Sequence, residues 1–161
     1  MSSIRTVGLG IAYDELQVGD RFRTLARTIT ETDLVNFINT TGMVEVLFTD
    51  VEYAKKHAPQ GGRLVPGALV YAMAEGLLVQ ATLQRTGLAF LSMNFEILAP
   101  TFVDDTVHVV VEVLECRATS KTLDKGLLRT KNNIVNQHGD VVISYSPLRM
   151  AASTELRDRD E

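Results

Sequence analysis

The segment Ala68–Leu83 (ALVYAMAEGLLVQATL) is apolar around nearly its whole circumference, apart from one ionised side chain, Glu75. A surface helix of a soluble protein shows a single apolar stripe, whereas a helix that is apolar all round is buried in a large core or in a membrane. The segment is too short and too interrupted to span a bilayer, which takes about 20 apolar residues. It therefore predicts a helix that the rest of the chain wraps, with one carboxylate set into its wall.

Size and charge restrict what such a chain can be. Its 161 residues suffice for one domain, and 45% hydrophobic with 22% charged residues is a composition typical of globular proteins. A net charge of −4 with acids and bases interspersed argues against nucleic acid or a membrane as a partner. Met1–Gly10 lacks the apolar block of a secretion signal, so we expect a cytoplasmic protein. The lone Cys116 cannot form an internal disulfide and is expected to be a small buried residue.

The first half of the chain is expected to contain one strand and several helices. Asp20–Ile29 follows a Gly-Asp turn and predicts a strand. Thr30 is placed to cap a helix that ends at Gly42, and Asp50 is placed to cap a shorter one. Pro66-Gly67 marks the start of the apolar helix.

From Gly87 onward the apolar residues recur with the period of two that is typical of strands. Four or five long strands are expected, including Leu127–Gln137 and Val141–Met150, which a Gly-containing turn joins into a hairpin. The alternating valines of 107–113 supply an apolar face. An antiparallel sheet that curls around the apolar helix would bury both patterns at once. We therefore predict an α+β fold, a single hot-dog domain over residues 1–151, followed by a charged and disordered tail over residues 152–161.

Five segments follow one another in this order: TITETDLVNFINTTG, TDVEYAKK, RLVPGALVYAMAEGLL, FEILAPTFVDDTVHVVVEV and NQHGDVV. Together they resemble the MaoC-like hydratase/dehydratase family of the hot-dog superfamily. The resemblance implies action on acyl thioesters of coenzyme A: the addition of water to, or its removal from, 2-enoyl or 3-hydroxyacyl groups in fatty acid metabolism. It also implies no metal and no cofactor, because coenzyme A is part of the substrate.

This sequence departs from the family at the segment that carries the chemistry. The family reads Gly-Asp-x-Asn-Pro-x-His there, and its Asp and His perform general acid–base catalysis. The matching residues 42–48 read GMVEVLF, so that Met43 stands at the Asp position and Phe48 at the His position. Neither side chain transfers protons, which makes them candidates for lining an apolar substrate pocket instead. Glu45, at the Asn position, is the titratable candidate in this segment.

The resemblance also assigns a role to Gly67, whose backbone N–H would donate a hydrogen bond to the thioester oxygen at the helix N-terminus. Free N–H groups and the positive end of the helix dipole favour such a charge, and Pro66 would line the same site. Glu75 lies eight residues further on, about 12 Å along a helix. Some hot-dog thioesterases have a catalytic carboxylate at this offset, although Glu75 would equally suit packing or a subunit contact.

Three functions remain open from the sequence. The chain is a hydratase rebuilt around Glu45 and Glu75, a thioesterase that uses Gly67 and Glu75, or a non-catalytic subunit that binds acyl thioesters beside an active homologue. A homodimer or higher homo-oligomer is expected, because a single curled sheet leaves an exposed edge. Candidate cations for the coenzyme A phosphates are Arg63, Arg129, Lys131 and Arg149.

Overall fold

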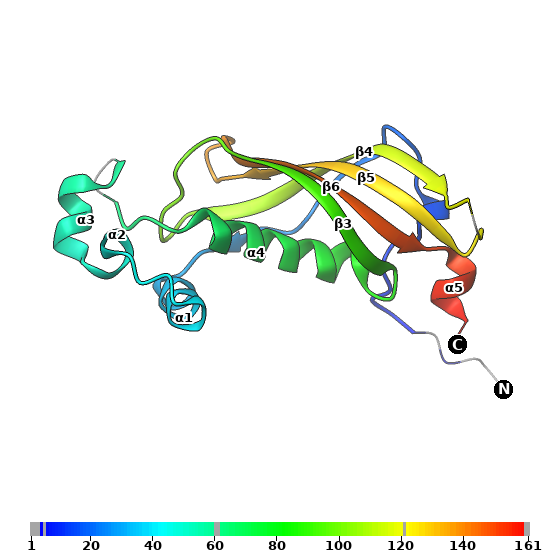
Figure 1. Cartoon of the computed structure of the whole chain (residues 1–161), viewed down its shortest axis with the longest axis horizontal. Helices are drawn as coiled ribbons and strands as arrows, with labels where there is room; N and C mark the ends of the chain where they lie inside the picture. The colour runs from blue at the N-terminus through cyan, green and yellow to red at the C-terminus, as the bar shows by residue number, and fades with distance from the viewer. Residues whose placement is uncertain (1–3, 5, 60–61, 121, 160–161) are drawn as a thin grey trace.

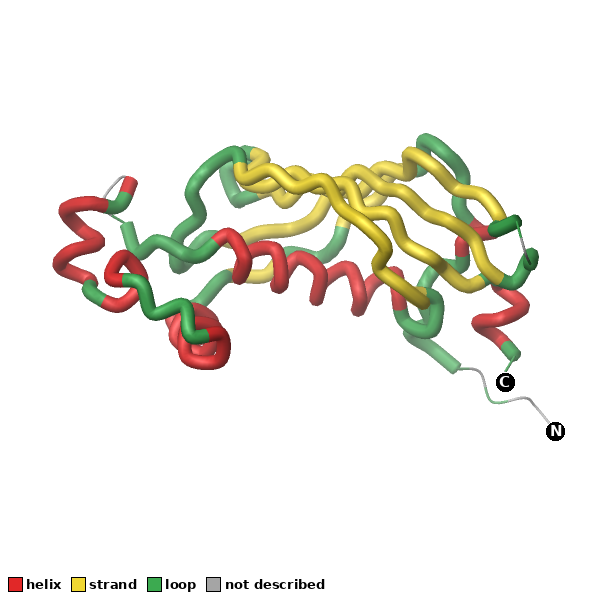
Figure 2. The backbone as a smooth tube through the Cα atoms, in the orientation of Figure 1, coloured by secondary structure: helices red, strands yellow, loops and turns green. Residues whose placement is uncertain are grey.

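An antiparallel sheet curls over one long helix in the computed structural model, which describes residues 4, 6–59, 62–120 and 122–159 (Figures 1 and 2). The first half of the chain contributes short elements and the central helix, and the second half contributes the long strands. In chain order the elements are η1 (Tyr13–Glu15), β1 (Arg21–Arg23), β2 (Arg27–Thr28), α1 (Glu31–Thr41), α2 (Val46–Thr49), α3 (Val51–His57), α4 (Gly67–Leu78), η3 (Val79–Leu83), β3 (Gly87–Ile97), β4 (Thr106–Ala118), β5 (Lys125–Val135), β6 (Val141–Ala152) and α5 (Thr154–Asp158).

The sheet has six strands in the order β1-β4-β5-β6-β3, and β2 also pairs with β4. Every pairing is antiparallel. The β5–β6 hairpin turns at residues 136–140, where Gly139 has a φ of +90° and Asn136 Oδ1 accepts the N–H of His138 and of Asp140. The sheet does not close, so β3 is an edge strand. The predicted α+β hot-dog architecture is confirmed.

The apolar helix predicted from the sequence is α4, which continues into the π-helical turn η3. Its buried residues pack with the inner faces of β4, β5 and β6 in one hydrophobic core. Val107, Val109, Val111 and Val113 are all buried, as their alternation predicts. Val113 packs in a second, smaller cluster with Tyr13 rather than against α4.

The predicted helix caps are confirmed. The Thr30 hydroxyl accepts the N–H of Asp33, and the Asp33 carboxylate accepts the N–H of Thr30, which together form a capping box at the start of α1. Gly42 ends α1 in the left-handed conformation, with a φ of 72°. Asp50 Oδ1 accepts the N–H of Tyr53 and so caps α3.

Three elements differ from the sequence prediction. The strand expected over Asp20–Ile29 is split into β1 and β2, because the hydroxyl of buried Thr24 accepts the N–H of Val109 and interrupts the pairing with β4. Residues 46–49 form α2 instead of a loop, and Glu45 caps that helix. The segment expected to be a disordered tail contains α5, which Ser153 caps.

The two ends of the sheet are covered differently. Helices α1, α2 and α3 lie together at the end where α4 begins, and α5 lies with the N-terminal segment at the opposite end (Figure 1). The candidate residues of the sequence analysis fall mainly on the α1–α3 side. No helix of the described residues is both long and apolar enough to cross a membrane.

Candidate functional site

A pocket of about 330 Å³ opens beside the N-terminus of α4. Its walls come from α2, from the segment that leads into α4, from the end of β3 and the following loop, and from β6. All but one of the described lining residues are apolar or glycine: Phe48, Pro59, Leu64, Val65, Pro66, Gly67, Ile97, Ala99, Pro100, Thr101 and Ile143. None of them carries an ionisable side chain.

Backbone pairing places the start of α4 at this pocket. Val65 N–H donates to the Thr101 carbonyl and Val103 N–H donates to the Arg63 carbonyl, both at 2.9 Å, so the chain enters the helix along a fixed line. Pro66 is the N-cap residue and has a φ of −58°. A proline loses nothing here, because the first N–H groups of a helix have no intrahelical acceptor.

Gly67 packs closely against the pocket wall. A Cβ on Gly67 would lie 2.5 Å from Ile97 Cδ1, so a side chain there would have to push the tip of the Ile97 side chain aside. Gly67 lines the pocket as the first residue of α4, and the first N–H groups of a helix have no intrahelical acceptor. Because these N–H groups carry the positive end of the helix dipole, they favour a carbonyl oxygen or an anion.

Of the predicted site residues, the structure brings together Phe48, Pro66 and Gly67. Phe48 is half-buried and also packs against the core. Met43 lies in the exposed loop between α1 and α2 and is not among the described lining residues. Glu45 is exposed, and its Oε2 accepts the N–H of Leu47 at 2.6 Å, so its carboxylate caps α2.

Arg63 ties this part of the molecule together. Its Nε and Nη2 donate to both carboxylate oxygens of Glu31 at the start of α1, at 2.9 to 3.2 Å. Its Nη1 donates to the carbonyl oxygen of Phe48. The side chain is only 19% exposed. Arg63 therefore holds the carbonyl end of α2 in place at the pocket, and its guanidinium is already committed to protein groups.

Glu75 lies apart from the pocket, on the side of α4 that faces β6. Arg149 Nη2 donates to both of its carboxylate oxygens, at 2.7 and 2.8 Å, and Tyr145 Oη donates to its Oε1 at 2.8 Å. The guanidinium of Arg149 also lies 4.8 Å from the centre of the Phe90 ring. Burial, together with the charge of Glu75, raises the pKa of Tyr145, which keeps the phenol protonated as a donor. This arrangement joins α4 to the sheet.

The remaining candidate cations and the histidines lie elsewhere. Arg129 pairs with Glu115 at 3.6 Å, and Lys131 is exposed on β5. His57 stacks against Tyr53, with 4.2 Å between ring centres. None of the three histidines is among the described residues that line the pocket. Within the described ranges, no three His, Cys, Asp or Glu side chains are grouped as a metal site would need.

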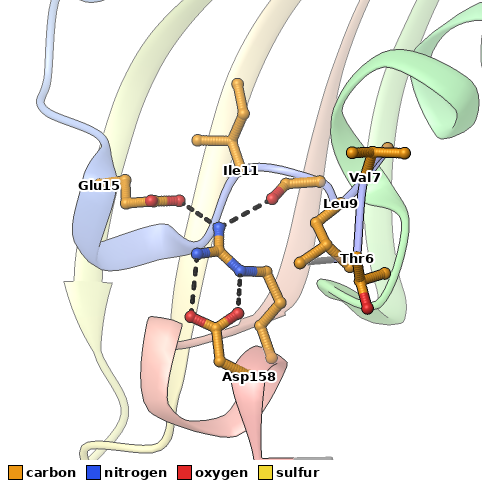
Figure 3. A pocket seen from close by; sticks show the side chains of 9 residues that line it. Thr6, Val7, Leu9, Ile11, Glu15 and Asp158 are labelled. Carbon is orange, nitrogen blue, oxygen red and sulfur yellow. Dashed lines mark hydrogen bonds and ion pairs between the residues drawn. The ribbon is translucent and has the colours of Figure 1, made fainter. Parts of the chain in front are cut away.

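A larger pocket, of about 610 Å³, lies at the other end of the molecule between the N-terminal segment and α5 (Figure 3). Arg157 lines this pocket, and its guanidinium donates hydrogen bonds to the carboxylates of Asp158 and Glu15 and to the carbonyl of Gly10. These bonds raise the pKa of Arg157, and they lower the pKa of Asp158. The ion cluster anchors α5 to the N-terminal segment, which explains why this charged segment is folded. It contains no predicted site residue.

Sequence reasoning missed most of the pocket wall and the partners of Glu75. Ile97 and Ile143 read as ordinary strand residues, and only the pairing of β3 with β6 brings them beside Gly67. Tyr145 and Arg149 lie 70 and 74 residues from Glu75. Their alternation on β6 would have placed them on one face, but no local signal names their partner on α4.

Similar structures support the architecture. A monoamine oxidase regulatory protein from Archaeoglobus fulgidus is 29% identical, with 90% of this chain and 96% of that chain covered and a TM-score of 0.77. An R-hydratase from Pseudomonas aeruginosa is 25% identical, with 89% and 87% covered and a TM-score of 0.74. A protein from Mycobacterium tuberculosis with a double hotdog fold is 22% identical, with a TM-score of 0.77. The match covers 93% of this chain but only 46% of that chain. A search of curated proteins finds no match to the sequence.

The family comparison covers the larger part of the chain. Residues 15–133 match the family described as MaoC like domain, from η1 through most of β5. This range includes the segment with Met43 and Phe48, the start of α4 at Gly67, and Glu75. With the hot-dog architecture in place around that segment, the chain belongs to the MaoC-like domain family.

Proposed function

We propose that this protein binds an acyl thioester of coenzyme A in the pocket at the start of α4. The thioester carbonyl would accept a hydrogen bond from the Gly67 N–H, and the acyl group would lie against Phe48 and Ile97. The observation that carries this proposal is the combination of an apolar pocket with a helix N-terminus in its wall. An apolar pocket suits an acyl chain, and the N–H groups at the helix N-terminus suit the carbonyl oxygen of the thioester to which that chain is attached.

Binding is favoured over proton transfer. Hydration of an enoyl thioester needs a group that activates water and a group that delivers a proton. The side chain in the pocket at the family's His position is Phe48, and no described lining residue titrates. Glu45, the titratable candidate of this segment, is occupied as a helix cap. We therefore expect weak hydration or none, and a role as an acyl-thioester-binding subunit.

Hydration is the second candidate, because the similar protein from Pseudomonas aeruginosa is described as an R-hydratase. Thioester hydrolysis through Glu75 is less favoured. That carboxylate is paired with Arg149 and is not among the described lining residues of the pocket. A nucleophile or general base has to reach the carbonyl that it attacks, and Glu75 lies about two helical turns from Gly67.

Calorimetry with crotonyl-CoA tests the binding proposal. Wild type should bind, and Phe48→Ala should weaken binding about tenfold, because it removes about 1.5 kcal/mol of apolar contact. Met43→Ala is the matched control, since its side chain lies outside the pocket, and it should bind like wild type. The absence of heat with any acyl-CoA up to millimolar concentration would overturn the proposal, as would unchanged binding by a folded Phe48→Ala protein.

Two activity assays on the same samples separate the candidates. Loss of the enoyl absorbance reports hydration, and release of free thiol reports hydrolysis. We expect neither above a low background. Hydration that survives Glu45→Gln and Glu75→Gln would contradict the binding-only function, because the chain would then contain another proton-transfer group.

We also propose that the protein is a homodimer joined through β3. Every residue of this edge strand except Met93 is exposed, and the strand has one charged residue, Glu96, and neither lysine nor proline to prevent pairing. The large exposed apolar side chains of β3, with Leu98 directly after it, are 36% to 58% exposed: Leu88, Phe90, Leu91, Phe95, Ile97 and Leu98. Beside β3, the exposed residues of α4 are small (Ala68, Ala72 and Gly76), so α4 of a second copy can approach closely.

A second copy is the occupant that this surface fits, because an antiparallel edge can pair with its own copy about a two-fold axis. Light scattering should give a mass of about twice 17.7 kDa for wild type. Leu91→Lys with Ile97→Lys should yield a folded monomer, and Leu114→Lys, on the exposed side of β4, should remain a dimer. A monomeric wild type at micromolar concentration would refute the proposal, and a homologous partner needed for assembly would favour a hetero-oligomer instead.

A further inference from the structure

One buried amide oxygen has no partner in the protein. Asn132 lies on β5 and faces α4, between Val111 of β4 and Tyr145 of β6. The residue is 1% exposed. Across the described ranges, its Oδ1 is the only fully buried side-chain nitrogen or oxygen that lacks a hydrogen bond. Leaving such an atom unpaired costs about 1–3 kcal/mol, and native proteins rarely tolerate it.

The amide of Asn132 also acts on a neighbouring side chain. Asn132 is the neighbour of Tyr145 across the β5–β6 pair, and its amide opposes the rise in the pKa of that phenol. Tyr145 in turn donates to Glu75. Reversing the amide would exchange an unpaired acceptor for an unpaired donor, so either orientation leaves one polar atom that needs a partner.

A cavity lies next to Asn132, between the sheet and the end of α4 with η3. It leaves about 30 Å³ for the centre of a water-sized sphere. A single water occupies only about 10–15 Å³, so the space admits a water molecule. Most of the wall is apolar, but four polar residues contribute to it: Thr82, Thr130, Asn132 and Arg149.

Those polar residues can complete the hydrogen bonds of a bound water. An ordered internal water typically makes two to four of them. Asn132 Oδ1 is an acceptor, and Thr130 carries a hydroxyl that both donates and accepts. The hydrogen bonds that Arg149 makes to Glu75 both leave from Nη2, and the guanidinium has further N–H groups on Nε and Nη1.

We propose that this cavity is a binding site for an ordered water molecule that donates to Asn132 Oδ1 and bonds to Thr130 or Arg149. The water extends the polar network of Glu75, Tyr145 and Asn132 and joins β5 to β6 and α4 in the middle of an otherwise apolar core. It is separate from the pocket at Gly67, with which the cavity shares no lining residue. The inference therefore does not depend on the proposed function.

Crystallography of the whole chain at about 1.5 Å resolution tests the proposal directly. We expect a well-ordered water within hydrogen-bond distance of Asn132 Oδ1. In a crystal pressurised with xenon, the noble gas should not enter this cavity, because xenon fills dry apolar cavities. A cavity without water density that takes up xenon would overturn the proposal.

A solution measurement and two variants complete the test. Nuclear Overhauser transfer from water to the side-chain amide protons of Asn132 should have the sign of a long-lived bound water. Asn132→Leu should abolish the water density. Asn133→Leu is the matched control, because the neighbouring asparagine contacts Ser144 and does not line the cavity, and this variant should keep the water. Absence of the transfer in wild type, or water density unchanged in a folded Asn132→Leu protein, would refute the site.

Discussion

The ion pair between Glu75 and Arg149 makes a measurable prediction about stability. The two side chains are 18% and 11% exposed, so water screens their charges little. Glu75→Gln keeps the size of the side chain and an oxygen for Tyr145, but it leaves the Arg149 cation without a counter-charge. Removing one partner of a buried pair costs about 3–5 kcal/mol, and we expect the lower end, about 3 kcal/mol, because both groups retain some contact with solvent.

Urea unfolding at pH 7 and at a fixed protein concentration measures this loss. At about 2–4 °C per kcal/mol for a chain of this size, the melting temperature should fall by about 6–12 °C. Arg149→Met should be destabilising as well, since it leaves a carboxylate unpaired. The double variant should be less destabilised than the sum of the two single changes, with a coupling of about 2 kcal/mol.

The exposed pair of Glu52 with Lys55 serves as the control, at side-chain exposures of 74% and 58%. The same cycle there should give a coupling below about 0.5 kcal/mol. If the coupling between Glu75 and Arg149 were equally small, the interpretation of Glu75 as a structural anchor would be wrong. The same Glu75→Gln protein should bind crotonyl-CoA like wild type when it is folded, because its carboxylate lies outside the pocket.

Four further predictions concern the core, the first helix cap, the carboxylate that completes this cap, and the missing catalytic pair. Val109→Asp should unfold the protein, because an unpaired buried charge costs several kcal/mol out of a total unfolding free energy of about 5–15 kcal/mol. Near-wild-type melting by circular dichroism would show that the core face is misassigned. Thr30→Ala should cost about 1 kcal/mol in thermal unfolding. Hydrogen bonds from Thr30 lower the pKa of Asp33 below 3.8, so the ionised Asp33 stabilises the fold above that pH. The difference in unfolding free energy between wild type and Asp33→Asn should therefore shrink as the pH falls through the lowered pKa. A difference that stays constant down to about pH 2 would contradict this. Met43→Asp combined with Phe48→His should raise the hydration of crotonyl-CoA, though only partly, because Met43 lies outside the pocket; no gain would show that more than the acid–base pair is missing.

Much of the fold could be predicted because its signals are local. The apolar circumference of α4, the alternation of valines on β4 and the capping box at Thr30 each depend on residues within a few positions of one another. The replacement of the family's His by Phe48 is likewise a local signal, because it can be read within one short segment. Local signals failed where a distant group intervened, as at Thr24, whose hydroxyl takes a backbone N–H of β4 and divides one expected strand into two.

The composition of the pocket and the role of the buried carboxylate were decided by tertiary structure. By sequence alone, Glu75 is one charge on an apolar helix, equally suited to catalysis and to packing. Its environment depends on how α4 is rotated over the sheet and on the register that brings Arg149 of β6 opposite it. The same geometry brings Phe48 to Gly67 and leaves Met43 outside. Periodicity along a chain specifies which residues share a face, but only the packing of one element on another specifies what that face contacts.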